Sequence, residues 1–195
     1  MKEAALGETT SLEELCDEIK GLMPDRPKVC IGIDGMDGVG KTSLARELAA
    51  LLGATVISLD DHVERKRGEY VSWIRCQEVT AAMRATGGNV VIVDGVCLRA
   101  VAERCGFAVD VHVYVKLVSK DSGLWHDADI CLAEAPVEDL KQHERELRRS
   151  GAVLSGREDV EQAESETGLR DELIDYHAKW SPLDKADAIC TTIRD

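Results

Sequence analysis

Residues 35–42 read Gly35-Met36-Asp37-Gly38-Val39-Gly40-Lys41-Thr42, and Ser43 follows them. They fit G-x-x-x-x-G-K-[ST], the pattern of a loop that wraps the phosphates of a nucleotide. The apolar stretch 29–34 before them predicts a buried strand, and leucines at helical spacing after Thr42 predict a helix. Strand, glycine-rich turn and helix in this order are the context that the pattern requires. We therefore expect the chain to bind a nucleoside triphosphate.

The residue types in this stretch predict how each of them binds. Glycines allow main-chain N–H groups to turn inward around phosphates, and the start of a helix adds a partial positive charge. Lys41 would reach the β- and γ-phosphates, and the Thr42 hydroxyl would hold Mg²⁺. The residues expected to bind the nucleotide are Gly35, Asp37, Gly38, Val39, Gly40, Lys41, Thr42 and Ser43.

Acidic residues close two further apolar runs. Asp94 ends the run 90–93, which has the form of a Walker B strand, so this acid can hold Mg²⁺ beside the Thr42 hydroxyl. The stretch 54–59 predicts a strand that ends at Asp60 and Asp61. In open α/β sheets the ligand lies beyond the carboxyl ends of the strands, so we expect these acids in the same crevice as Lys41.

Predicted strands alternate with predicted helices along the whole chain, which indicates an α/β fold. The expected strands are 29–34, 54–59, 90–93, 109–115 and 187–193. The expected helices are 12–22, 42–52, 73–86, 98–105, 137–149 and 157–179, the last interrupted near Gly168. This order predicts three α/β/α layers around a mainly parallel five-stranded sheet, with residues 1–10 as a loose end.

Composition narrows the classes of partner. A chain of 195 residues suffices for one domain, or one domain with a lid, and its net charge of -13 argues against a nucleic acid polymer as partner. No apolar run approaches the roughly 18 residues of a membrane span, so we expect no membrane partner. Seven cysteines without a pairing pattern, and no signal peptide, indicate a reduced compartment and a cytoplasmic protein. Cys30, Cys97 and Cys190 lie in apolar runs and are expected to be buried.

The segment 137–149 concentrates basic residues in an otherwise acidic chain: Lys141, Arg145, Arg148 and Arg149. Such a run is usually a solvated helix face. Behind a phosphate-binding loop it can instead be a lid, because phosphoryl transfer needs cations on the migrating group. On that hypothesis we predict Arg145 and Arg149 to be catalytic.

The chain resembles the P-loop small-molecule kinases of the uridine kinase, pantothenate kinase and phosphoribulokinase group. Four segments carry the resemblance: 35–42, 56–61, 91–96, and 176–189 with Ala186-Asp187. The resemblance implies a P-loop NTPase fold, ATP and Mg²⁺ as cofactors, and a small-molecule hydroxyl as phosphoryl acceptor. It also implies that Asp60 is the general base toward that hydroxyl. The alternative is that Asp60 is a second Mg²⁺ ligand and Asp61 the base.

The resemblance divides the chain into an N-terminal helix with linker, 1–27, and a P-loop kinase domain, 28–195, with a lid at roughly 137–157. The residues expected to line the acceptor pocket are Asp61, His62, Tyr70, Trp73 and Arg75. Arg75 could bind an anionic acceptor or pair with Glu78 on its own helix. Between Asp61 and Val90 there is room for a loop and one helix, without the hairpin that covers the nucleobase in uridine kinases.

Two alternative functions remain at this stage. The loop 37–42 is also similar to that of thymidylate kinases, which would make the acceptor a nucleoside monophosphate, although Gly95 stands where that family has arginine after the acid. A regulatory ATPase without an acceptor is the other alternative. Whatever the function, the N-terminal helix could serve a homodimer interface.

Overall fold

The structure is a computed structural model that describes residues 8–64, 69–121, 136–165 and 167–194. Within these ranges the centre is a six-stranded parallel sheet in the order β1-β6-β5-β2-β4-β3. The strands are β1 (Glu8–Thr9), β2 (Val29–Gly35), β3 (Thr55–Ser58), β4 (Val90–Asp94), β5 (Val111–Ser119) and β6 (Ala188–Arg194).

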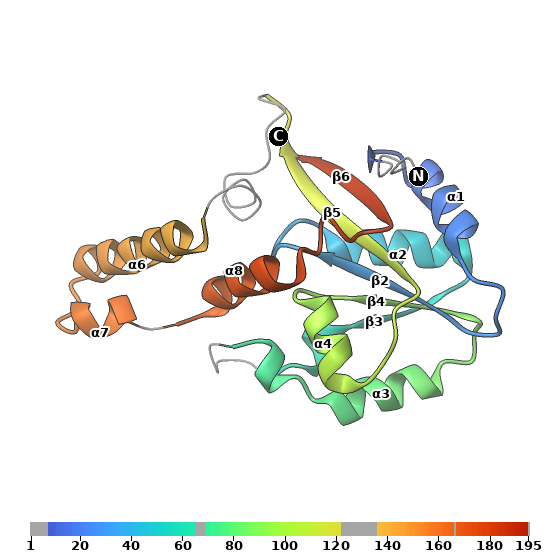
Figure 1. Ribbon diagram of the computed structural model, residues 1–195, viewed down its shortest axis with the longest axis horizontal. Coiled ribbons are helices and arrows are strands. Elements are labelled where there is room, and N and C mark those ends of the chain that lie inside the picture. Colours follow the sequence, from blue (N-terminus) through green and yellow to red (C-terminus); the bar gives the residue numbers. More distant parts are fainter. Residues whose placement is uncertain (1–7, 65–68, 122–135, 166, 195) are drawn as a thin grey trace.

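Helices cover both faces of this sheet (Figure 1). The described helices are α1 (Leu12–Leu22), α2 (Lys41–Leu52), α3 (Cys76–Ala85), α4 (Leu98–Cys105), α6 (Val137–Leu154), α7 (Val160–Ser165) and α8 (Leu169–Trp180), with short 3-10 helices η1 (Leu59–His62) and η2 (Val71–Trp73). Helices α1 and α2 contact each other and the sheet on one face, and α3 and α4 do so on the other. The predicted three-layer α/β/α fold is confirmed.

One strand lies beyond the expected five. β1 pairs in parallel with β6, with Glu8 opposite Ile189 and Thr9 opposite Cys190. Residues 8 and 9 are therefore part of the sheet edge and not of a loose end. This strand cannot be predicted from the sequence, because two residues are too few to show a periodic pattern.

The sheet register determines where the chemistry lies. All of β2 is buried, which explains its continuous apolar sequence as a central parallel strand. Ile33 of β2 and Ser58 of β3 both lie opposite Asp94 of β4. The phosphate-binding loop, Asp94 and the residues after Ser58 therefore lie together at the carboxyl ends of β2, β4 and β3.

Two predicted helix caps, at Ser11 and Gly53, are present in the structure. Other helix ends differ from those that the sequence predicts. The Ser11 hydroxyl accepts a hydrogen bond from the Glu14 N–H (3.3 Å), and Gly53 ends α2 in the left-handed conformation. Trp73 was expected to begin a helix, but the chain forms η2 there and α3 starts only at Cys76. Helix α6 runs through Ser150 and Gly151, where an end was predicted, and continues to Leu154. The expected break near Gly168 separates α7 from α8.

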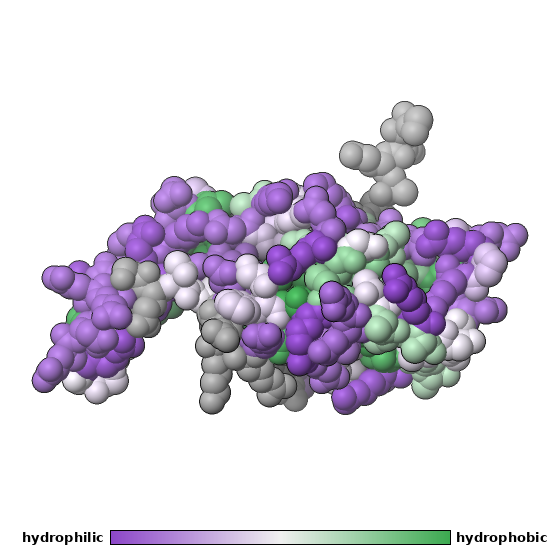
Figure 2. Space-filling view, turned by 90° about the horizontal axis from the view of Figure 1, so that it is seen from below, coloured by the Kyte–Doolittle hydropathy of each residue, from purple (hydrophilic) through white to green (hydrophobic). Residues whose placement is uncertain are grey.

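Helices α6 and α7 extend away from the sheet, and α8 leads back toward it (Figure 1). Helix α6 packs on α7 and α8. On the face seen in Figure 2 this projecting end of the molecule is almost uniformly hydrophilic. No helix in the described ranges is long and apolar enough to cross a membrane.

Two cysteines, Cys76 and Cys105, form a disulfide although the sequence shows no pairing pattern. Cys76 begins α3 and Cys105 ends α4, and their Cα atoms lie 4.8 Å apart. The bond joins positions 29 residues apart that the packing of α3 on α4 brings together, so no local spacing could reveal it. Cys30, Cys97 and Cys190 are buried, as expected.

Replacing Cys76 and Cys105 together with serine is expected to lower the free energy of unfolding by about 2–4 kcal/mol, because the bond restricts the unfolded chain. Urea unfolding without reductant, followed by circular dichroism, measures the change. A reductant should destabilise the parent protein and leave the double variant unaffected. An equal response of both proteins would contradict a stabilising disulfide.

Candidate nucleotide and acceptor site

The loop between β2 and α2 has the backbone that a phosphate cradle requires. Gly38 and Gly40 have φ angles of +77° and +96°, a region that side chains disfavour. A Cβ atom added to either glycine would meet no other heavy atom within 4 Å, so this side of the bend is open. At Gly35 the requirement is different, because a Cβ there would lie 2.6 Å from the Val115 carbonyl oxygen.

Lys41 lies inside this bend. Its side chain is buried, and its ammonium group donates a hydrogen bond to the carbonyl oxygen of Met36. Burial lowers the pKa of Lys41, and the nearby carboxylates of Asp34, Asp37, Asp60 and Asp94 oppose that shift. The loop therefore holds one buried cation surrounded by carboxylates.

Thr42 and Asp94 are in direct contact. The Thr42 hydroxyl donates to Asp94 Oδ2 (2.7 Å), and the Ser58 hydroxyl lies 3.4 Å from the same oxygen. Asp94 Oδ1 is buried without a hydrogen-bond partner among the described residues, and burial raises the pKa of this carboxyl group. A buried, unpartnered carboxylate oxygen beside a hydroxyl fits the oxygen ligands that Mg²⁺ prefers.

Asp34, directly before the loop, anchors its first residue, a role that the sequence analysis did not predict. Its Oδ1 accepts a hydrogen bond from the Gly35 N–H (2.8 Å), and its Oδ2 accepts one from the Tyr176 hydroxyl of α8. Burial raises the pKa of the Asp34 carboxyl group. The available signal was an acidic residue inside a buried apolar strand, directly before the loop.

Asp60 stands at the neighbouring strand end, in η1, with an exposed side chain. Its Oδ1 accepts a hydrogen bond from the Tyr70 hydroxyl (2.7 Å). Tyr70 was expected to line the acceptor pocket. It is buried and contacts Asp60 through its hydroxyl, so little of its side chain is available to an acceptor. The structure thus brings Lys41, Thr42, Asp94 and Asp60 close together at the carboxyl ends of β2, β3 and β4.

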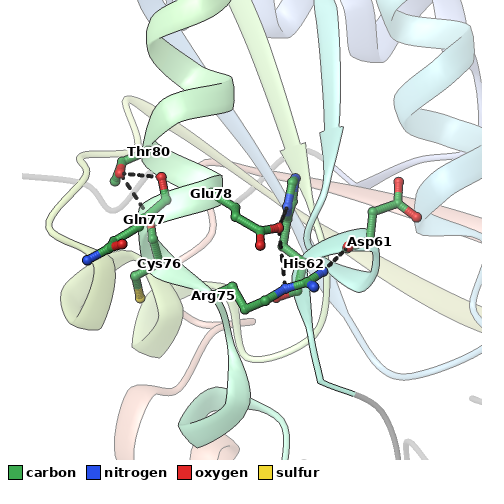
Figure 3. A network of polar contacts seen from close by, with 7 residues as sticks. All are labelled: Asp61, His62, Arg75, Cys76, Gln77, Glu78 and Thr80. Atoms are coloured by element: carbon green, nitrogen blue, oxygen red, sulfur yellow. Dashed lines mark hydrogen bonds and ion pairs between the residues drawn. The ribbon is translucent and has the colours of Figure 1, made fainter.

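The other residues expected in the acceptor pocket form a polar network (Figure 3). Arg75 contacts Glu78 (Nε to Oε2, 3.3 Å) and donates to the main-chain oxygen of Asp61 (2.8 Å). His62 Nδ1 lies 3.4 Å from the same Glu78 oxygen, and the Asp61 side chain points away from this group (Figure 3). Of the two roles considered for Arg75, pairing with Glu78 is the one observed. Trp73 is partly buried in η2.

The basic residues of α6 contact their own part of the molecule. Arg148 forms a two-pronged ion pair with Asp171 of α8 (2.7 and 3.2 Å). Arg145 donates to Gln142 within α6, and Arg149 lies 3.8 Å from Glu164 of α7. In this arrangement the structure does not bring Arg145 and Arg149 together with Lys41.

A cavity of about 640 Å³ adjoins the phosphate-binding loop. This volume is in the usual range of small-molecule sites. One wall is the loop with the first turns of α2, and the other is the end of β6 with the segment after β1. The lining residues include Thr10, Leu12, Gly38, Gly40, Ser43, Glu47 and Thr192.

Known proteins match this chain in sequence and in structure. The family model of shikimate kinase matches residues 37–92. The solved structure of a protein described as a possible uridine kinase from Bacillus stearothermophilus superposes with a TM-score of 0.52 at 16% identity, covering 92% of this chain and 96% of that one. The fold is that of the P-loop kinases.

This P-loop kinase fold confirms the resemblance drawn from the sequence. A shikimate kinase from Bacteroides thetaiotaomicron also matches, with a TM-score of 0.37 and 21% identity over 83% of this chain and 84% of that one. No curated protein sequence matches this chain significantly.

Substituting Gly95 with alanine is expected to destabilise the fold by about 1–3 kcal/mol, because the new methyl group would overpack a closed site. Its Cβ would lie 2.8 Å from Leu59 Cβ and 3.0 Å from the Tyr70 hydroxyl. Urea unfolding gives the change. Gly88→Ala is the matched control, since its Cβ would find no atom closer than 3.8 Å. Equal stability of the two variants would contradict the close packing at Gly95.

Proposed function

We propose that the protein is an ATP-dependent kinase that transfers the γ-phosphoryl group to a hydroxyl of a small metabolite. The observation that carries the proposal is the position of Asp60. Its exposed carboxylate lies near Lys41 and the Thr42–Asp94 pair, at the same end of the sheet. A phosphate cradle alone suits any nucleotide-binding protein, whereas a carboxylate beside it also suits a reaction with an alcohol.

The loop residues have distinct roles in this proposal. The main-chain N–H groups around Gly38 and Gly40 bind the phosphates, and Lys41 exchanges its contact with the Met36 carbonyl for phosphate oxygens. Thr42 and Asp94 would hold Mg²⁺, which would neutralise charge on the phosphate oxygens. The remaining residues of the loop, Gly35, Asp37, Val39 and Ser43, shape the cradle and its rim.

Asp60 acts as the general base. Tyr70 occupies its Oδ1, and Oδ2 has no hydrogen-bond partner in the part of the chain that the structure describes. Oδ2 can therefore accept the proton of the acceptor hydroxyl as that oxygen bonds to the γ-phosphorus atom of ATP, while the bond from this phosphorus to the β,γ-bridging oxygen breaks and ADP leaves. Arg75, the nearby cation predicted for the acceptor pocket, pairs with Glu78 at an exposed position. The family-model match to shikimate kinase also supports a small-molecule acceptor.

Arg145 and Arg149 are the lid cations that would close on the transferring group. Arg145 is held by a neutral glutamine, and the ion pair of Arg149 is long and exposed, so both side chains can be released at little cost. Arg148 is more firmly bound by its two hydrogen bonds to Asp171. An arginine supplied within the same chain can contribute about 10³-fold or more to the rate.

Lys41→Ala is expected to weaken the binding of Mg·ATP by about tenfold or more, because a charge-assisted hydrogen bond to phosphate contributes about 1.5–3 kcal/mol. Isothermal titration calorimetry measures the affinity. Lys20→Ala, at an exposed lysine that pairs with Asp17 on α1, is the control and should bind like the parent. Parent-like binding by Lys41→Ala would remove the lysine from the site.

Asp60→Asn is expected to retain Mg·ATP binding and to lower acceptor-dependent turnover by about 100-fold or more, the usual contribution of a general base. A coupled assay of ADP release, with nucleosides, sugars and vitamin precursors as acceptors, measures it. Asp61→Asn decides between the two carboxylates, since the larger loss identifies the base. ATP hydrolysis that no acceptor accelerates would instead indicate a regulatory ATPase.

A further inference from the structure

Helix α8 reaches the loop that follows Asp60 through one side chain. The two carboxylate oxygens of Glu172 accept hydrogen bonds from consecutive main-chain N–H groups, those of Tyr70 and Val71 (2.9 Å for Val71). These contacts join positions about a hundred residues apart in the sequence. Two N–H groups bound by one carboxylate fix both the position and the orientation of this short stretch of backbone.

The side chain of Tyr70 carries this restraint to Asp60. Its ring is buried in the core cluster, and its hydroxyl donates to Asp60 Oδ1 (2.7 Å). The hydroxyl lies so close to Gly95 that a Cβ there would be only 3.0 Å away. Burial and the adjacent Asp60 carboxylate raise the pKa of Tyr70, so the hydroxyl keeps its proton and serves as a donor.

We propose that Tyr70 and Glu172 are positioning residues for Asp60. Glu172 fixes the backbone at residues 70–71, and Tyr70 then fixes the rotation of the Asp60 carboxylate so that Oδ2 faces the acceptor hydroxyl. The inference rests on the proposed role of Asp60 as base. An exposed carboxylate on a 3-10 turn otherwise samples several rotamers, and a misplacement of about 1 Å can cost 100-fold in rate.

The first test is Tyr70→Phe, which keeps the ring and removes the hydroxyl. We expect kcat to fall by roughly 10- to 100-fold, with KM for ATP within about twofold of the parent value, because only the orientation of Asp60 changes. Tyr114→Phe is the matched control. Tyr114 is equally buried, and its hydroxyl contacts His177 Nε2 (3.0 Å) on a different part of α8.

The second test is Glu172→Gln, which keeps the shape of the side chain but leaves only one oxygen for two N–H groups. We expect the same loss of kcat without a matching loss of ATP affinity. Glu144→Gln is its control, because that carboxylate is also largely buried but pairs with Arg170 of α8 and not with the backbone at residues 70–71. Melting temperatures of all variants show whether any loss reflects unfolding.

A double-mutant comparison separates positioning from general support. If Tyr70 acts through Asp60, Tyr70→Phe should add little to the loss already caused by Asp60→Asn, whereas a structural effect would add in full. Parent-like kcat in Tyr70→Phe and Glu172→Gln would overturn the inference. A fall in kcat accompanied by an equal fall in ATP affinity would also overturn it. If Asp60→Asn has no detectable turnover, this comparison of kcat with ATP affinity in the single variants replaces the double-mutant comparison.

These results remain distinct from failure of the proposed function. A parent protein without acceptor-dependent turnover would refute the kinase proposal itself. An active parent, an inactive Asp60→Asn variant and a fully active Tyr70→Phe variant would leave the kinase proposal intact and remove Tyr70 from the positioning of the base.

Discussion

The buried ammonium group of Lys41 is the constraint around which the site is arranged. A cation inside a protein is tolerated only when charges or dipoles nearby replace its water. Here the Met36 carbonyl accepts its hydrogen bond, and carboxylates from three strand ends and the loop itself surround it. The glycine bend, the Thr42–Asp94 contact and Asp60 all lie around this one charge.

The two buried acids near Lys41, Asp34 and Asp94, differ in how their carboxylate oxygens are hydrogen-bonded. Asp34 and Asp94 are buried, and burial raises the pKa of both. Each has a hydroxyl donor, Tyr176 for Asp34 and Thr42 for Asp94, which partly replaces water. Asp94 alone keeps an unpartnered buried oxygen among the described residues, so of the two it is the acid suited to a metal ion.

The features that the sequence revealed are local ones. The phosphate loop, the Walker B strand and the caps at Ser11 and Gly53 each lie within a few consecutive residues, so that residue type and spacing determine them. The missed features depend on folding. The Cys76–Cys105 disulfide, the Tyr176–Asp34 contact and the support of Tyr70 by Glu172 join residues 29, 142 and 102 positions apart. Strand β1 was missed for a different reason, since two residues pair only because β6 already offers an edge.

Helix α8 gives the site a dependence on the order in which the chain is made. When a ribosome has released the chain as far as β5, the phosphate loop, Asp94 and Asp60 are all present, but Glu172 and Tyr176 are not. The nascent domain can then form its central strands while the stretch around Tyr70 and the start of the loop lack their anchors. Completion of this arrangement is therefore a late step of synthesis, at which the arrival of a single helix anchors both the start of the loop at Asp34 and the stretch around Tyr70.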